Sequence, residues 1–213
     1  MSKDLLAIAA MGPVIPVMVI DKVEQAVPLA QALVAGGVRV LEITLRTPAA
    51  LQSMREIAAA VPEAVIGAGT LRTPADAEAV LAAGARFAVS PGYSSVLGRA
   101  CRDLQLPLLP GVATSSEIMQ ATEDGLQFLK FFPAMAAGGA AMLKAWGSVF
   151  ADVRFCPTGG IALDTAPGLL ALSNVACVGG SWLTPADAVR DGRWAVITRL
   201  AQEASALRAP VPH

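Results

Sequence analysis

The residue with the clearest chemical potential is Lys130, which interrupts an apolar run, QFLKFFP, at residues 127–133. If this run is a strand, its period of two places Phe128, Lys130 and Phe132 on one face. Lys130 is the one lysine of four with bulky apolar neighbours on both sides. Burial disfavours the charged ammonium form, and a neutral amine can attack a ketone to form a Schiff base. The structural alternative is a lysine whose ammonium reaches solvent from the strand end.

A second polar face occurs in VRVLEITLRT, at residues 38–47. The alternation places one set of side chains on a single face: Val40, Glu42, Thr44 and Arg46. The opposite face is apolar and suits contact with helices, so the polar set is expected to point away from them, into a confined interior. A carboxylate there could move protons for a buried lysine. A structural ion pair between Glu42 and Arg46 is the alternative.

Eight short apolar runs alternate with alanine-rich segments of helical period and so predict the fold. The runs begin at residues 14, 38, 64, 86, 107, 127, 153 and 175. Nearly continuous apolar strands are typical of parallel strands covered on both faces. We predict an α/β protein, a (β/α)8 TIM barrel forming one domain over residues 1–213, with a short helix at 4–11 and a loose tail at 205–213. A doubly wound open sheet is the alternative, but no GxGxxG motif follows the first strand.

The composition excludes several function classes. With 54% hydrophobic and 15% charged residues the chain is too apolar to be disordered, and 16 basic against 17 acidic residues without a basic run argue against a nucleic-acid partner. The single histidine is the last residue, His213, which disfavours Ser/His/Asp and Cys/His nucleophiles and zinc sites with histidine ligands. We therefore expect chemistry without histidine and without a metal.

Cysteine usage and the apolar N-terminal segment bear on location. Cys101, Cys156 and Cys177 form no CxxC motif and suit buried thiols in a reducing compartment. The uncharged segment 5–20 contains Gly12, Pro13 and Pro16, which argue against a membrane-spanning helix. These features predict a cytoplasmic protein that does not bind a membrane. A mean hydropathy of +0.57 suits either apolar surface buried between subunits or an alanine-rich helical shell.

Glycine-rich turns end the seventh and eighth predicted strands, in PTGG at 157–160 and GGS at 179–181. Barrels frequently bind phosphate after these two strands through backbone N–H groups. The same glycines could serve only as tight-turn residues. Two such turns at these strands indicate a phosphate site.

The motifs above resemble those of the class I aldolases that cleave 2-keto-3-deoxy-6-phosphogluconate (KDPG) and 4-hydroxy-2-oxoglutarate (KHG). The similarity covers nearly the whole chain. It rests on ALVAGGVRVLEITLRT from 32, VIGAGT from 65, FAVSPG from 87, PLLPGVAT from 107, FLKFFPA from 128, RFCPTGG from 154 and GGSWLTPAD from 179.

The resemblance implies a role for each matching position. Lys130 resembles the imine-forming lysine and Glu42 the general acid/base, with no metal or organic cofactor. The implied substrate contacts are Arg46 and Thr70 for the carboxylate, Pro91 and Phe132 for the pocket wall, Thr158 for the sugar hydroxyls, and Gly159, Gly160 and Ser181 for the phosphate. Threonine at 158 favours the gluconate over the galactonate epimer. Family members are typically cytoplasmic homotrimers that take a phosphorylated 2-keto acid and release pyruvate.

Three other functions stay open at this stage. The chain could cleave the galactonate epimer of the substrate. It could be a sugar-phosphate isomerase with Glu42 as the base and Lys130 as an electrostatic clamp. It could also be a non-catalytic phosphate-binding barrel or assembly subunit in which Lys130 and Glu42 form a structural ion pair.

Overall fold

The computed structural model describes residues 2–207 as alternating strands and helices. The strands are β1 Val14–Met18, β2 Val40–Thr44, β3 Val65–Gly69, β4 Phe87–Val89, β5 Leu108–Leu109, β6 Gly111–Val112, β7 Phe128–Phe131, β8 Arg154–Pro157 and β9 Val178–Gly180. Each of the eight predicted runs contains a strand, and the fifth run is divided into β5 and β6 at Pro110.

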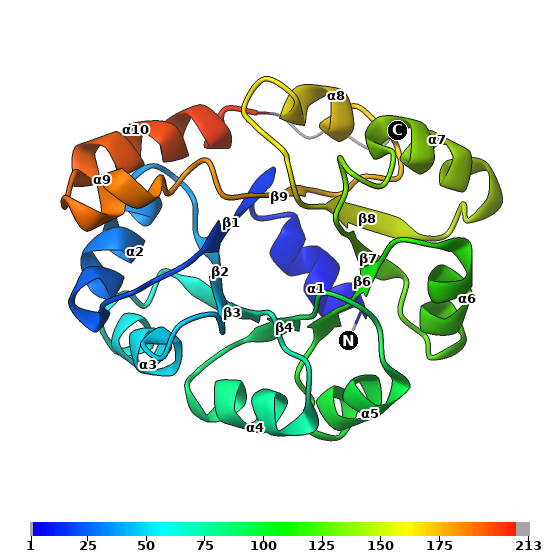
Figure 1. Cartoon of the computed structure of the whole chain (residues 1–213), viewed down its shortest axis with the longest axis horizontal. Coiled ribbons are helices and arrows are strands. Elements are labelled where there is room, and N and C mark those ends of the chain that lie inside the picture. The colour runs from blue at the N-terminus through cyan, green and yellow to red at the C-terminus, as the bar shows by residue number, and fades with distance from the viewer. Residues whose placement is uncertain (1, 208–213) are drawn as a thin grey trace.

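The helices follow the strands in regular order. They are α1 Ser2–Ala9, α2 Ala26–Ala35 after a short 3-10 turn at Val23–Gln25, α3 Ala50–Ala60, α4 Pro74–Ala82, α5 Ser95–Asp103, α6 Ser115–Glu123, α7 Gly139–Val149, α8 Ala166–Leu170, α9 Ala186–Arg190 and α10 Trp194–Ser205. Figure 1 shows α2 to α10 around the outside of the strands. In α4 and α6, a threonine and an acidic residue three positions later form a capping box that starts the helix.

The strands pair in parallel in two sheets. One has the order β5-β4-β3-β2-β1-β9 and the other the order β6-β7-β8. Single parallel bridges, Phe155 with Val175 and Thr158 with Gly179, connect β8 to the segment around β9. The predicted α/β class with parallel strands is therefore confirmed.

The strands have an outer and an inner apolar layer. On β2, Leu41 and Ile43 belong to the large cluster beneath the helices, whereas Val40 belongs to a smaller cluster with Phe87 and Phe128. Helix α1 adds Leu5 and Ala9 to this smaller cluster and contacts β7. These strand residues lie near the amino ends of their strands, so α1 covers the interior at that end. It lies in the middle of the ring of strands in Figure 1.

Two predicted boundaries differ from the structure. The N-terminal helix spans Ser2–Ala9, two residues earlier than the predicted 4–11. The predicted tail at 205–213 begins with placed residues, because the Ser205 hydroxyl donates to the Gly36 carbonyl over 2.9 Å and Leu207 packs against the core. The rest of that tail, residues 208–213, lies outside the described residues.

Candidate active site

Lys130 and Glu42 meet in the interior of the fold. Lys130 is the third residue of β7 and Glu42 the third residue of β2, and their exposed fractions are 6% and 3%. Lys130 Nζ donates to Glu42 Oε1 over 3.2 Å. The period of two on both strands produces this meeting, because it turns both side chains inward from the apolar outer face. The predicted burial of Lys130 is confirmed, and Lys22 and Lys144 are exposed.

The ion pair predicted as an alternative for Glu42 is not the one observed. Strand β2 ends at Thr44, and Arg46 lies exposed in the turn that follows. In the part of the chain that the structure describes, Glu42 pairs with Lys130 and not with Arg46. Thr44 is fully buried, and its hydroxyl donates to the Met18 carbonyl of β1 over 2.8 Å. On this face of β2 and the turn after it, Glu42 therefore lies in the interior, Thr44 bonds the neighbouring strand, and Arg46 lies at the rim.

Two thiols lie next to the Lys130–Glu42 pair. Cys156 is the Cα partner of Lys130 between β7 and β8, and Cys177 precedes β9. Both are buried and free, as predicted. The hydrogen bond with Cys156, the burial of the thiol and the nearby Glu42 carboxylate raise the pKa of Cys177 well above its ordinary value. Cys177 therefore stays a neutral thiol beside the pair.

Phe132 and Pro91 lie close to the lysine. The ring of Phe132 has its centroid 5.5 Å from Lys130 Nζ, a cation–π distance. Pro91 is exposed, and its backbone lies against Gly111, the Cα partner of Lys130 on β6. The structure thus places the Phe132 ring near the amine and the Pro91 backbone against the strand that neighbours β7.

Arg46 and Thr70 follow neighbouring strands. Gly69 is the last residue of β3 and the Cα partner of Thr44, and its carbonyl accepts a hydrogen bond from Leu45 N–H over 2.9 Å. Thr70 has a φ of 68°, a left-handed conformation that is unusual for a β-branched residue. Such strain clusters at functional sites. Both side chains therefore leave the same rim of the sheet, at its carboxyl edge.

The two glycine-rich turns also lie side by side. Thr158 forms a bridge with Gly179, so the turn at Gly159 and Gly160 is next to exposed Ser181. Gly159 and Gly160 have φ values of 102° and 75°, which residues other than glycine rarely adopt. Within residues 2–207, neither glycine N–H donates a hydrogen bond to the chain. These groups are free to bind an anion.

Thr158 is 6% exposed and lies between the Lys130 strand and the turn at Gly159 and Gly160. Its hydroxyl donates to the Cys156 carbonyl over 3.3 Å and lies 3.9 Å from the Cys156 sulfur. Thr158 N–H donates to the Phe131 carbonyl over 2.9 Å, which ties it to the strand of Lys130. The residue therefore connects the lysine strand with the glycine turn.

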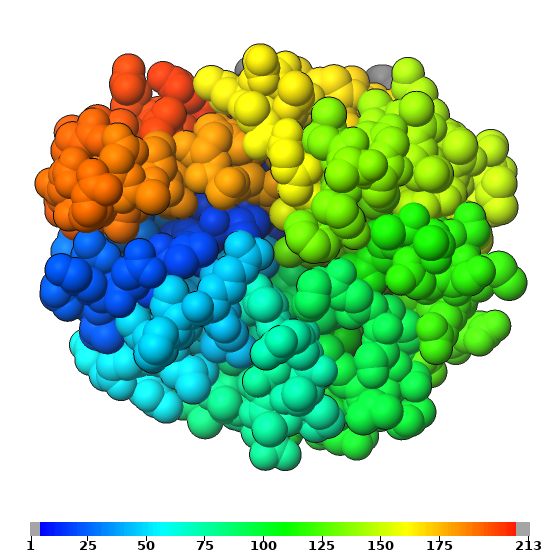
Figure 2. Space-filling view, in the orientation of Figure 1, coloured from blue at the N-terminus to red at the C-terminus, as the bar shows by residue number. Residues whose placement is uncertain are grey.

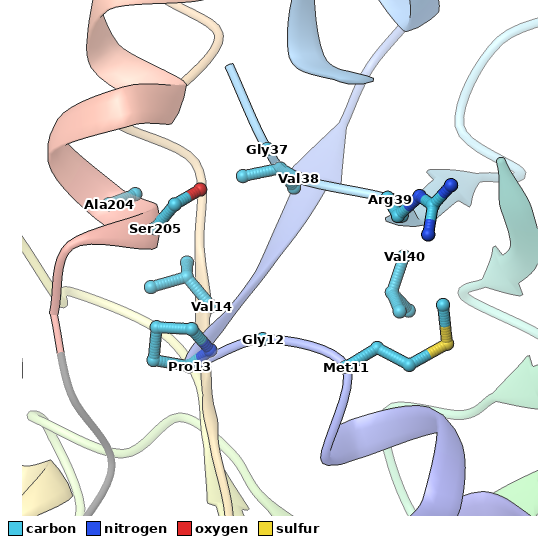
Figure 3. A pocket seen from close by; sticks show the side chains of 10 residues that line it. All are labelled: Met11, Gly12, Pro13, Val14, Gly37, Val38, Arg39, Val40, Ala204 and Ser205. Atoms are coloured by element: carbon cyan, nitrogen blue, oxygen red, sulfur yellow. The ribbon is translucent and has the colours of Figure 1, made fainter. Parts of the chain in front are cut away.

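A separate small pocket lies away from this cluster. Its lining residues are Met11, Gly12, Pro13, Val14, Gly37, Val38, Arg39, Val40, Ala204 and Ser205. Figure 3 shows that these residues come from the amino ends of β1 and β2 and from the end of α10. Lys130 and the glycine turns are not part of it, so this pocket does not mark the candidate site. Figure 2, in the orientation of Figure 1, shows atoms from distant parts of the sequence, coloured orange, blue, cyan and green, meeting near the centre of the molecule.

Two other kinds of feature are absent from the described residues, a metal-ligand cluster and a membrane-spanning helix. No three His, Cys, Asp or Glu side chains among residues 2–207 are grouped as metal ligands would be. No helix in this part of the chain has the length and apolar character needed to cross a membrane.

The sequence did not predict that two glycines leave space for the side chains of Glu42 and Thr158. A Cβ at Gly69 would overlap Glu42 Oε1, and a Cβ at Gly179 would overlap Thr158 Oγ1. The available signal was the position of these glycines within short apolar strands, Gly69 as the last residue of β3 and Gly179 as the middle residue of β9. It became specific only when the strands were placed next to one another.

Comparison with known proteins agrees with this arrangement. The family model "Aldolase: KDPG and KHG aldolase" matches residues 6–200. The 2-dehydro-3-deoxy-phosphogluconate aldolase of Dickeya dadantii is 54% identical over 195 residues, 92% of each chain. The KHG/KDPG aldolase of Escherichia coli K12 is 52% identical over 198 residues, 93% of each chain.

A solved structure of the Legionella pneumophila KDPG aldolase, with pyruvate captured as a covalent carbinolamine, superposes with a TM-score of 0.92 at 50% identity, covering 94% of this chain and 98% of that chain. The Zymomonas mobilis ZM4 aldolase with 3-phosphoglycerate gives a TM-score of 0.93 at 45% identity, covering 99% of both chains. The match spans the strands that carry the buried lysine, the carboxylate and both glycine turns. The chain therefore belongs to the KDPG and KHG aldolase family.

Proposed function

We propose that the protein is a class I aldolase that cleaves KDPG to pyruvate and D-glyceraldehyde 3-phosphate. The observation that carries the proposal is the contact of 3.2 Å between the buried Lys130 amine and the Glu42 carboxylate, in a chain of this family. The dual name of the E. coli relative supports a second reaction, the cleavage of 4-hydroxy-2-oxoglutarate to pyruvate and glyoxylate.

Lys130 is the nucleophile of the proposed reaction. Glu42 accepts a proton from the Lys130 ammonium, and the neutral Nζ attacks the C2 ketone of the substrate. Glu42 then moves the protons that convert the carbinolamine to a protonated imine with loss of water. The carbinolamine of pyruvate captured in the Legionella relative supports this step. The imine then accepts the electron pair that carbon–carbon cleavage releases. No metal or organic cofactor is needed for that role.

Glu42 is the general acid/base of the cleavage step. Glu42 removes the proton of the C4 hydroxyl, and the C3–C4 bond breaks. The electron pair of that bond forms the enamine of pyruvate on Lys130, and the aldehyde leaves. Protonation at C3 and hydrolysis of the imine then release pyruvate. The distance of 3.2 Å keeps the carboxylate within reach of the atoms around the amine.

The remaining residues orient the substrate. Arg46 and Thr70 bind its carboxylate, for which a guanidinium fork is well suited. Phe132 and Pro91 border the pyruvoyl part, and Thr158 contacts a sugar hydroxyl and favours the gluconate epimer.

The phosphate binds at the glycine turns. The N–H groups of Gly159 and Gly160, which have no hydrogen-bond acceptor among residues 2–207, and the exposed Ser181 hydroxyl support this assignment. The 3-phosphoglycerate in the Zymomonas relative has the chain length and phosphate of glyceraldehyde 3-phosphate, and this supports it too.

The two sheets form one closed (β/α)8 barrel in a single domain. The bridge between Thr158 and Gly179 supports closure on one side. On the other side only Pro110 separates β5 from β6, and proline has no N–H for a ladder bond. The Pro110 carbonyl still accepts a hydrogen bond from Lys130 N–H over 2.8 Å.

The protein is a cytoplasmic homotrimer. Exposed apolar side chains, among them Val96, Met119 and Val149 with exposed fractions of 54, 55 and 71%, support subunit contacts. Three free buried thiols suit the reducing cytoplasm.

The test is reduction of the purified protein with sodium borohydride in the presence of pyruvate, followed by peptide mass spectrometry. A reduced pyruvate adduct on the Lys130 peptide, absent from Lys130→Ala, is the expected result. A folded wild type that forms no adduct would overturn the proposal of an aldolase. The isomerase and the phosphate-binding protein would then be the remaining functions. With the adduct established, turnover of KDPG, its galactonate epimer and 4-hydroxy-2-oxoglutarate identifies the substrate.

A further inference from the structure

The space occupied by the Glu42 carboxylate exists because residue 69 is glycine. Gly69 ends β3, and the Cα partner of Glu42 on this strand is Gly67, two residues earlier. The Glu42 side chain therefore extends along the face where a side chain at 69 would be. A Cβ at 69 would overlap Oε1 of Glu42 and lie 2.9 Å from its Cγ and Cδ. Carbon atoms prefer separations of roughly 3.5–4.0 Å, so the carboxylate would have to shift by at least about 0.6 Å.

The backbone at Gly69 does not require a glycine. Its φ is not among the positive values, so alanine fits the backbone. The atoms that a methyl group would meet first belong to Glu42, the end of a flexible side chain, and not to a strand. An alanine at 69 is therefore compatible with folding and acts on the position of the carboxylate.

The carboxylate has little freedom to move without losing its contact. Lys130 Nζ lies 3.2 Å from Oε1, and Glu42 is close enough to Cys177 to raise its pKa. Any shift away from residue 69 changes the Nζ to Oε1 distance inside a cluster where both side chains are less than a tenth exposed.

We infer that Gly69 is a positioning residue of the aldolase, which sets the Glu42 carboxylate against the Lys130 amine by leaving the volume that the carboxylate occupies. The inference rests on the proposed function for its catalytic consequence. A displacement near 1 Å of a group that transfers protons can cost about 10²-fold in rate. The three atoms nearest to a Cβ at 69 all belong to Glu42, so the substitution is expected to act on kcat more than on substrate binding by Arg46 and the glycine turns.

The test is a cycle of four proteins: wild type, Gly69→Ala, Glu42→Ala and the double variant. In the wild-type background, Gly69→Ala is expected to lower kcat about 10²-fold, to change KM less than about threefold and to lower the unfolding temperature. In the Glu42→Ala background the three atoms nearest to the new Cβ, Oε1, Cδ and Cγ of Glu42, are removed. It should then change the residual kcat less than about threefold and leave the unfolding temperature unchanged.

The control is Gly168→Ala in α8, where a Cβ meets nothing within 4 Å and φ is not positive. It should match the wild type in kcat and KM. The inference is overturned if Gly69→Ala keeps wild-type kcat, or if its losses are the same with and without the Glu42 side chain. If the wild type itself shows neither cleavage nor a pyruvate adduct, the proposed function fails. The unfolding temperatures of the four proteins then still decide whether residue 69 and the carboxylate compete for one space.

Discussion

Removing the charge of Lys130 should destabilise the protein chiefly through Glu42. Lys130→Met keeps an unbranched side chain of similar length and deletes the ammonium that contacts Oε1 at 3.2 Å. Only 3% of Glu42 is exposed, so solvent compensates poorly for the lost partner. Breaking a buried ion pair by removing one partner costs about 3–5 kcal/mol.

The loss corresponds to a decrease of about 6–20 °C in unfolding temperature, since 1 kcal/mol is about 2–4 °C for chains of this size. The measurement is urea unfolding followed by circular dichroism, at one fixed protein concentration. The m-value should not change, because the surface exposed on unfolding is the same. The matched control is Lys144→Met, an exposed lysine on α7, with an expected change within about 0.5 kcal/mol.

The double variant Lys130→Met/Glu42→Gln separates charge from packing. It buries no uncompensated carboxylate, so it should be more stable than Lys130→Met, although both have lost the contact of the amine with the Phe132 ring. Equal stabilities of the single and double variants, or a single variant within about 1 kcal/mol of the wild type, would refute the reasoning. Such a result would mean that the buried Glu42 carboxylate does not need Lys130 for stability.

Three further predictions concern separate parts of the molecule. Glu42→Gln should lower kcat for KDPG cleavage about 10²- to 10⁴-fold in a coupled pyruvate assay, and near-normal turnover would contradict its role in proton transfer. Burial and the hydrogen bond to Asp124 raise the pKa of Tyr93, the single tyrosine. An ordinary tyrosine forms its phenolate near pH 10, so the phenolate absorbance of this protein should appear only at higher pH. Because that pKa is raised on folding, its contribution to stability is complete below pH 10 and lost above it, and the unfolding free energy of Tyr93→Phe should fall less than that of wild type between pH 9 and 11. Gly179→Ala should displace Thr158, whose Cγ2 would lie 2.9 Å from the new Cβ, and lower kcat/KM for KDPG about tenfold while the pyruvate adduct on the lysine still forms; unchanged discrimination between the two epimers would argue against a role of residue 158 in specificity.

Local pattern was sufficient to predict the elements and the reactive pair. The apolar runs are strands because their side chains are buried on both faces, and that requirement is visible in each run by itself. Lys130 and Glu42 were predicted for the same reason, since each places a charge at an inward position of an apolar strand. The resemblance then provided roles for the substrate-binding residues, which no local pattern assigns.

Tertiary structure decided which charges meet. The sequence left two partners open for Glu42: Arg46, four residues away on the same run, and Lys130. The structure pairs Glu42 with Lys130, 88 residues away, because the two strands face each other across the interior and β2 ends before Arg46. Such a contact depends on the order and register of strands that are distant in sequence.

The sequence by itself determined which residues are buried, which strands they form and which side chains could react, because the periods of 2 and 3.6 are local properties of the backbone. The tertiary structure decided the 3.2 Å contact, the left-handed backbone of Thr70 and the space that Gly69 and Gly179 leave for Glu42 and Thr158. Each of these depends on packing between strands that the chain brings together only on folding, where a single methyl group changes what fits.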